Sequence, residues 1–394
     1  MVLAPVAPIF VAFFGVESVS RFRKSKDETG KVLFAVLAII LLIASIFIFV
    51  NFNRQVKAQA YGFVPSYYTF QWQKAMQWTR ENTPKDAVFA HWWDYGYWVQ
   101  SIGERATVTD GGNVIVYWNY LSGRFVLTGD NQKDALEFLY THNATHLLID
   151  SSDLGKYGAF ASIGSNENYD RFSSGPAILI SDKRAIREMK NATIRDYNMP
   201  AGGGRISIYP LEEDIFFNKN GSEINLLKEN AGFAGISITT SQENNSISFK
   251  NAEAIFISSN NMVTLPLRYI YYNGKLIDFG EGINAAAYIM PRVSSEIDDM
   301  GAAMYISPRL IRGLLSQIYI LNDAFGNFKN FKLAHSEPSV IAEQINYNIN
   351  EFFYIDGGGV MGPIKIWEIK YNGDEKVNPD YLDTDYSKYI SWQL

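Results

Sequence analysis

The chain has no cysteine, and only 4 of its 394 residues are histidine. The lack of cysteine excludes disulfides, thiolate metal sites and cysteine nucleophiles, so an extracellular domain of this chain needs a large hydrophobic core. Its 41 acidic residues outnumber 35 basic ones and no basic face is evident, which argues against a nucleic-acid partner. The sequence also lacks a phosphate-binding glycine loop and internal repeats. The histidines have no metal-site spacing, and we interpret them as structural.

Two apolar segments lie near the N-terminus. Residues 32–53 contain no charged side chain and, at about 1.5 Å per residue, can cross about 30 Å of hydrocarbon. Residues 2–16 are also apolar, and because they lack a basic leader they do not resemble a signal peptide. We predict two membrane spans. The loop between them is rich in lysine and arginine, so the positive-inside rule puts it in the cytoplasm and the rest of the chain outside.

The part after the second span alternates between helical and strand patterns. Helices are predicted over residues 68–80, 131–142 and 153–163, and strands over residues 87–90 and 146–149. Ser151 and Ser152 are the expected capping residues of the third helix. This alternation indicates an α/β core with a mostly parallel sheet.

Composition changes at the glycines of residues 202–204, after which short alternating segments with Asn-Gly and Asn-Asn turns indicate a β-rich lobe. A helical pattern returns from residue 307, and residues 364–369 are predicted as a strand that rejoins the first sheet. We therefore expect an α/β external domain with an inserted β-rich lobe, preceded by two transmembrane helices. The predicted divisions are residues 1–55 for the two helices and their basic loop, 56–200 for the α/β core, 201–295 for the β-rich insertion, and 296–394 for the return to the core.

The most distinctive segment is HWWDYGYW, residues 91–98. It follows a short predicted strand, and glycine-containing turns after strands are where open sheets present functional residues. Trp92 and Trp93 can donate two indole N–H bonds, Asp94 can accept one, and the rings can exclude water, so the three can hold one hydroxyl group. From composition alone, a structural role is equally reasonable, with the tryptophans filling the core and Asp94 capping a turn.

Trp92, Trp93, Asp94, Tyr95 and Gly96 resemble the WWDYG signature of oligosaccharyltransferase catalytic subunits. The flanking residues 81–84, 103–105 and 110–113 resemble the archaeal members, and we expect the resemblance to cover nearly the whole chain, weakest in the β-rich lobe. In that family the motif binds the serine or threonine hydroxyl two residues after the acceptor asparagine. The resemblance implies the C-terminal part of an archaeal-type glycosyltransferase that transfers a lipid-linked oligosaccharide to asparagine.

A second segment is similar to the DK motif of the same family. Asp153 and Lys156 match an aspartate and a lysine three residues apart, which the family follows with methionine or isoleucine four residues later. On a helix both residues share one face with Phe160 and Ile163, so the lysine can reach the aspartate of the first motif. Phe160 departs from the pattern, which makes Ile163 a second candidate for contact with a threonine methyl. Without the resemblance, a capping aspartate and a solvated lysine are favoured.

The resemblance also implies a divalent cation, Mn or Mg, that polarises a lipid pyrophosphate leaving group, with carboxylates that hold the asparagine amide. In the family these carboxylates lie on external loops between earlier spans. This chain has none of those loops, so we expect its metal and catalytic residues to lie upstream, with Met1 as an internal start. The chain is then the acceptor-recognition part of a membrane enzyme, with a large external C-terminal domain. Its expected partners are a sequon-bearing polypeptide, a lipid-linked oligosaccharide and the membrane.

Two other interpretations are open. The chain can be a non-enzymatic, membrane-anchored carbohydrate-binding or cell-envelope protein that uses Trp92, Trp93 and Trp98 as sugar-stacking platforms, although this leaves Asp153 and Lys156 without a role. It can also be a separate acceptor-binding polypeptide that works beside a catalytic partner.

Overall fold

The computed structural model describes residues 7–62, 68–200, 206–207, 216–219, 222–226, 231–243, 246–258, 261–345, 347–348 and 350–385. The chain divides into two compact units, Met1–Thr69 and Phe70–Leu394. We call them the N-terminal unit and the C-terminal unit. The predicted boundary at residues 202–204 lies outside the described residues.

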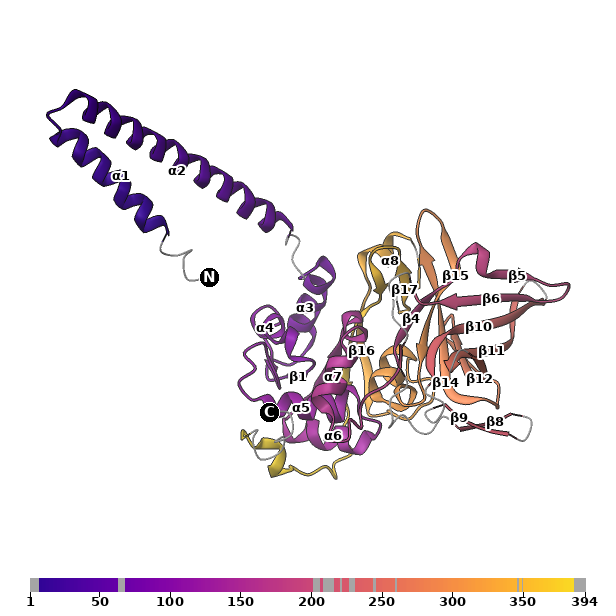
Figure 1. Ribbon diagram of the computed structural model, residues 1–394. Coiled ribbons are helices and arrows are strands. Elements are labelled where there is room, and N and C mark those ends of the chain that lie inside the picture. The colour runs from indigo at the N-terminus through magenta and orange to yellow at the C-terminus, as the bar shows by residue number, and fades with distance from the viewer. Residues whose placement is uncertain are drawn as a thin grey trace. The chain divides into compact units, whose positions relative to one another are not determined.

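The N-terminal unit is a helical hairpin in which α1 (Ala7–Lys24) packs against α2 (Glu28–Gly62), as Figure 1 shows. Within the described residues one helix, over Glu28–Ala60, is long and apolar enough to cross a membrane. The second predicted span is therefore not confirmed. Its residues 2–6 lie outside the described part, and the rest belongs to α1, which also carries an ion pair between Glu17 and Arg21 at 2.8 Å.

A five-stranded sheet forms the centre of the C-terminal unit. Its order is β16-β19-β3-β1-β2, with bounds Phe331–Glu337, Ile364–Ile369, His146–Ile149, Val88–Ala90 and Ala106–Thr107. β1 is parallel to β2 and β3, whereas β19 is antiparallel to both β3 and β16. The predicted return of residues 364–369 to this sheet is confirmed. The sheet is mixed rather than mostly parallel, because the two strands contributed by the C-terminal part, β16 and β19, pair antiparallel.

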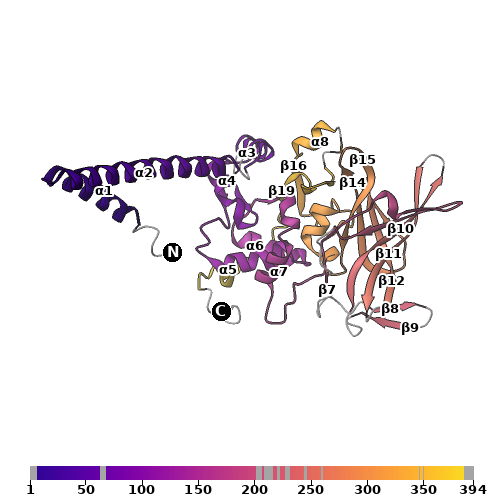
Figure 2. The same ribbon diagram turned by 45° about the horizontal axis from the view of Figure 1, so that its top comes forward.

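Short helices surround this sheet. They are α3 (Phe70–Asn82), α4 (Gly96–Ser101), α5 (Val116–Leu121), the π-helical η2 (Ser122–Leu127), α6 (Gln132–Thr141) and α7 (Tyr157–Gly164). The helices predicted at residues 68–80 and 131–142 are confirmed as α3 and α6. Asn131 caps α6 by accepting a hydrogen bond from the Lys133 amide at 2.9 Å. Figures 1 and 2 show α3 to α7 gathered at one end of this unit.

The β-rich part of the C-terminal unit contains a closed ring of seven described strands. They are β4 (Ala177–Ile180), β6 (Thr193–Asn198), β10 (Gly232–Glu243), β11 (Ser246–Ser258), β12 (Asn261–Tyr272), β14 (Ile283–Val293) and β15 (Ile297–Ile306). Parallel pairing between β12 and β14 closes the ring, which leaves its central strands without open edges. The β-rich part thus begins before residue 201 and extends beyond residue 295, on both sides of the predicted limits.

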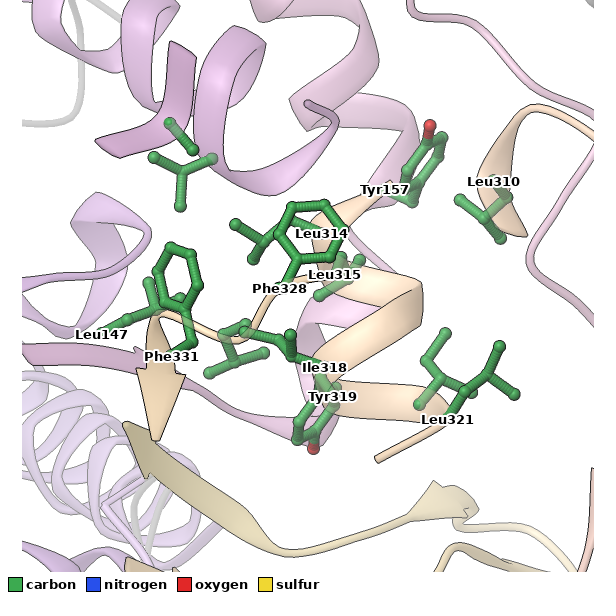
Figure 3. Close-up of a cluster of buried hydrophobic side chains, with 14 of the residues drawn as sticks. Leu147, Tyr157, Leu310, Leu314, Leu315, Ile318, Tyr319, Leu321, Phe328 and Phe331 are labelled. Carbon is green, nitrogen blue, oxygen red and sulfur yellow. The ribbon is translucent and has the colours of Figure 1, made fainter. Parts of the chain in front are cut away.

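Two hydrophobic cores hold the C-terminal unit together. One fills the ring of strands, where Phe233 stacks on Tyr305 with ring centroids 4.1 Å apart. The other joins the α/β core to the ring and is built around η5 (Leu310–Arg312) and the π-helical η6 (Leu315–Ile320). Figure 3 shows Tyr157 of α7 packed with Leu310 and Leu314 in this second core. Because Tyr157 is buried there, the start of α7 has a fixed position beside the sheet.

Candidate functional site

The two predicted motifs follow the carboxyl ends of two adjacent strands in the five-stranded sheet. β1 ends at Ala90 and runs through His91 and Trp92 into the short helix η1 (Trp93–Tyr95). The neighbouring strand β3 ends at Ile149 and runs into a second short helix, η3 (Ser151–Leu154). Because β1 and β3 are adjacent and parallel, their carboxyl ends bring both following segments together.

An ion pair joins the two motifs. The Lys156 Nζ lies 2.8 Å from Oδ2 of Asp94 and donates a hydrogen bond to the Tyr95 hydroxyl at 2.8 Å. The side chains of Asp94 and Lys156 are each 28% exposed, so a ligand can reach them. Within the described residues no hydrogen bond to Oδ1 of Asp94 is found. The pair therefore offers a free carboxylate oxygen next to an ammonium group.

A buried carboxyl group lies behind this pair. Asp153 is fully buried and accepts a hydrogen bond from the Tyr95 hydroxyl at 2.6 Å, and its Oδ1 is 3.7 Å from the Lys156 Nζ. Burial raises the pKa of Asp153 to about 7, against the opposing effect of the Lys156 charge. Burial also raises the pKa of Tyr95 well above 10, so its hydroxyl remains a donor at neutral pH. Tyr95 thus links Lys156 to Asp153.

The segment around Asp153 differs from the predicted helix over residues 153–163. Asp150, rather than Ser151 or Ser152, is the capping residue: its side chain accepts from the Ser152 amide at 2.9 Å, while Asp153 accepts from the Asp150 amide at 3.1 Å. This reciprocal pair is a capping box, and the α-helix starts only at Tyr157. The prediction of serine caps was wrong because an aspartate one residue earlier competes for the same amides.

The two tryptophans have different environments. Trp92 is 2% exposed and its ring meets Phe160 edge to face, with centroids 4.7 Å apart. Trp93 is half-buried. In the described part of the chain neither indole N–H has a hydrogen-bond partner, so both are available as donors. Phe160 is fully buried beneath Trp92, whereas Ile163 one turn further is half-buried, and contact of either with a threonine methyl stays a prediction.

Gly96 is set apart from the other motif residues by close backbone packing. A Cβ atom at this position would lie 2.5 Å from the Asp110 Cα and 2.8 Å from the Thr109 carbonyl oxygen. Real Cβ atoms do not approach backbone that closely, so only glycine fits at the start of α4. The absence of a side chain at Gly96 therefore allows the loop after β2 to pack closely against the motif.

His91 is buried beside this site. Its Nδ1 lies 2.7 Å from the Trp92 carbonyl oxygen, and burial lowers its pKa to about 4. Asp110 and Asp94 act in the opposite direction but do not overcome the burial. The imidazole is thus neutral at pH 7, which agrees with a structural role.

The site does not suit a divalent cation. No group of three or more histidine, aspartate or glutamate side chains close enough to bind a metal occurs among the residues that the structure describes. Asp94 is paired with Lys156, and Asp153 is buried behind Tyr95, whereas Mn or Mg needs several converging oxygen ligands. The expected cation therefore has no donor set here.

The raised pKa of Asp153 predicts a pH dependence of stability. A carboxyl whose pKa is near 7 when folded and near 3.8 when unfolded favours folding below pH 4, and this contribution is lost as the pH rises through 7. Relative to Asp153→Asn, the wild-type chain should lose up to about 4 kcal/mol of unfolding free energy between pH 4 and 8. Thermal unfolding followed by tryptophan fluorescence measures this difference.

Comparing the wild-type chain with Asp153→Asn controls for the other groups that titrate in this pH range. His91 and His142, whose pKa values burial lowers to about 4, destabilise the fold as the pH falls, but they do so equally in both chains. If the difference in unfolding free energy between wild type and Asp153→Asn stayed constant from pH 4 to 8, the pKa of Asp153 would not be raised as stated.

Known proteins resemble a limited part of this chain. Residues 84–146 match the STT3/PglB/AglB core domain, a stretch that contains Trp92–Gly96 but not Asp153 or Lys156. Dolichyl-phosphooligosaccharide-protein glycotransferase 1 of Pyrococcus furiosus is 32% identical over 98 residues, 24% of this chain and 10% of that protein. The rice dolichyl-diphosphooligosaccharide–protein glycosyltransferase subunit STT3B is 26% identical over 103 residues, 24% of this chain and 14% of that protein.

A solved structure, the C-terminal domain of C. jejuni pglb, is 12% identical with a TM-score of 0.33, covering 76% of this chain and 99% of that one. The sequence matches cover only 10% and 14% of the length of the Pyrococcus furiosus and rice proteins. The sequence matches are also narrower than the expected resemblance over nearly the whole chain.

Proposed function

We propose that this chain, which belongs to the STT3/PglB/AglB family by the core domain at residues 84–146, binds the serine or threonine of an Asn-x-Ser/Thr acceptor for an oligosaccharyltransferase. One observation carries the proposal: Asp94 and Lys156, from segments 62 positions apart in the chain, form an accessible pair 2.8 Å apart. Trp92 and Trp93 directly precede Asp94, and among the described residues their indole N–H groups have no hydrogen-bond partner. The set combines one acceptor with several donors, which is what an alcohol requires.

A neutral hydroxyl suits this site better than a charged group does. Lys156 compensates the charge of Asp94, so neither a cation nor an anion is needed for balance. The Oδ1 of Asp94 accepts a hydrogen bond from the hydroxyl group, while the Lys156 ammonium or an indole N–H donates a hydrogen bond to the hydroxyl oxygen. A side chain that lacks the hydroxyl leaves these groups unpaired and partly desolvated, which gives steep discrimination.

Tyr95 and Asp153 position Lys156 in this scheme. The Tyr95 ring lies beneath the ammonium, with the Lys156 Nζ 4.4 Å from its centroid, and its hydroxyl fixes the direction of one ammonium proton. Asp153 orients that hydroxyl. The lysine is therefore held toward Asp94 before a ligand arrives, which lowers the entropic cost of binding.

The wider reaction is proposed from the names of the relatives, which are glycosyltransferases that use dolichyl-linked oligosaccharides. We propose that the chain acts in transfer of such a glycan to asparagine, and that a Mn or Mg ion and the catalytic carboxylates come from outside the described residues. The apolar helix α2 is consistent with a membrane location. The basic residues at the facing ends of α1 and α2 and in the turn between them favour a cytoplasmic turn and an external C-terminal unit.

The alternative role in sugar binding through the motif tryptophans is less well supported. Trp92 is 2% exposed, and Trp98 packs against Trp72 with centroids 4.9 Å apart. A stacking platform needs an open ring face, so Trp93 is the remaining candidate of the three.

Peptide binding to the full chain in detergent tests the proposal. A fluorescent Asn-x-Thr peptide should bind about 30- to 100-fold more tightly than the isosteric Asn-x-Val peptide, since loss of the hydroxyl leaves a charge-assisted site unpaired. A Gln-x-Thr peptide is the control and should bind almost as well as Asn-x-Thr, because the proposed site contacts only the hydroxyl residue. Equal affinity for the threonine and valine peptides would refute the assignment.

A further inference from the structure

A second pocket lies at the opposite end of the five-stranded sheet. It has a volume of about 380 Å³ and lies where α3 ends, where β3 begins, and along β16 and β19. Its walls include Trp78, Asn82, His146, Glu368 and Tyr371. The proposed hydroxyl site follows the carboxyl ends of β1 and β3, whereas this pocket lies at the amino end of β3, so the two are separate.

Two aromatic walls of this pocket are held rigidly. Trp78 stacks on His335 with ring centroids 4.4 Å apart and an interplanar angle of 6°. The Tyr371 hydroxyl donates to the Ala144 carbonyl oxygen at 2.5 Å, and its ring meets Tyr140 edge to face at 5.2 Å. Side chains fixed in this way lose little entropy when a ligand binds.

Three polar groups of the pocket have unused hydrogen-bonding capacity. His146 is 6% exposed and uses Nδ1 with the Thr145 hydroxyl at 2.8 Å, and in the described part of the chain no hydrogen bond to its Nε2 is found. Asn82 donates through its amide nitrogen to the Trp78 carbonyl at 3.0 Å, which leaves the amide oxygen. Glu368 contacts Lys370 through Oε1, which leaves Oε2. A ligand in this pocket therefore meets the free oxygens of Asn82 and Glu368 as acceptors, together with one His146 nitrogen whose role depends on the tautomer.

The charge balance of the pocket favours a neutral ligand. Lys370 compensates Glu368 and holds the pKa of its carboxyl below the ordinary value. Burial lowers the pKa of His146, so its imidazole is neutral at pH 7. A neutral molecule that brings several adjacent hydrogen-bond donors and apolar C–H faces is a sugar ring, whereas a peptide brings about one backbone donor per residue.

We propose that this pocket binds one neutral sugar residue of hexose size, with its C–H face against Tyr371 or against the Trp78 face turned away from His335, and its hydroxyls on Asn82, His146 and Glu368. Its volume is at the small end of the range for ligand sites, which suits a monosaccharide unit rather than a long glycan. This inference does not depend on the proposed hydroxyl site.

Saturation-transfer NMR on the full chain in detergent tests this pocket with glucose, mannose, galactose and N-acetylglucosamine as probes. At least one sugar should receive saturation transfer and bind with a millimolar Kd. Ala334→Trp, which places a large ring into the pocket from the exposed edge strand β16, should abolish the signal. Glu368→Gln keeps the shape and should weaken binding about tenfold, by loss of one charge-assisted hydrogen bond.

Two controls separate this site from other causes. Leu333→Trp adds the same bulk to β16 at an exposed residue that does not line the pocket, and should leave the signal unchanged. Asp94→Ala should also retain sugar binding, which distinguishes failure here from failure of the proposed hydroxyl site. Absence of transfer to all four sugars, or a signal that survives Ala334→Trp, would overturn the proposal, as would selective binding of N-methylacetamide in place of sugars.

Discussion

Asp94→Ala is expected to bind an Asn-x-Thr peptide about 100-fold more weakly than the wild-type chain, and to bind Asn-x-Thr and Asn-x-Val peptides equally. In the proposed site its carboxylate is the accessible acceptor, and loss of a charge-assisted hydrogen bond costs about 2 to 3 kcal/mol. Asp94→Asn keeps the shape and one oxygen but not the charge, so an intermediate loss of about tenfold is expected. Titration of each peptide, followed by fluorescence anisotropy, measures both effects.

Stability should change much less than binding in Asp94→Ala. The carboxylate and its lysine partner are both partly exposed, and such pairs contribute about 1 kcal/mol or less. Asp196→Ala is a matched control, because Asp196 is 26% exposed and pairs with Arg187 at 2.9 Å on the ring of strands. That variant should bind the peptide normally. If Asp94→Ala retained its preference for threonine over valine, the acceptor role of Asp94 would be wrong.

Gly96→Ala should destabilise the C-terminal unit by about 1 to 3 kcal/mol. The added methyl group would overlap the backbone of Asp110 and Thr109, and backbone on a packed loop cannot rotate away as a side chain can. Either the loop after β2 or the start of α4 must then move. Thermal and denaturant unfolding of the purified chain, together with its yield, measures this loss.

The control for Gly96→Ala is Gly158→Ala in α7. Apart from its chain neighbours and the backbone of its own helix, no atom lies within 4 Å of a Cβ at Gly158, so alanine fits and should stabilise the helix by up to about 1 kcal/mol. The two substitutions add the same methyl group with opposite expected signs. Unchanged stability of Gly96→Ala would mean that the loop carrying Asp110 moves without cost, and that the motif glycine has another role.

Several elements of this fold could be predicted because periodicity, capping residues and apolar runs are visible in a short stretch of sequence. The helices α3 and α6 follow amphipathic periods, and α6 has its capping residue Asn131 next to its start. β3 is a run of four apolar or aromatic residues that is buried throughout. The strand at residues 364–369 is predicted from its β-branched and aromatic residues, and its return to the first sheet is confirmed by its pairing with β3.

Other features depend on contacts between distant residues. No local pattern encodes the antiparallel pairing of β16 and β19 or the closure of the ring through β12 and β14. The same holds for the use of ring strands on both sides of residues 201–295. The start of α7 was misjudged because Asp150 and Asp153 form a capping box, although the spacing of these two aspartates is visible in the sequence.

The sequence by itself determined the chemical groups of the proposed site: the residues Trp92 to Gly96 and the pair Asp153 and Lys156 were recognisable because each motif occupies a few consecutive positions. Only the tertiary structure decided how they act together. Burial of Asp153 sets its pKa, the hydroxyl of Tyr95 bonds to both Asp153 and Lys156, the latter 61 positions further along the chain, and the buried ring of Phe160 packs against Trp92. These properties come from desolvation and from the parallel pairing of β1 and β3, which depend on the folded environment rather than on neighbours in sequence.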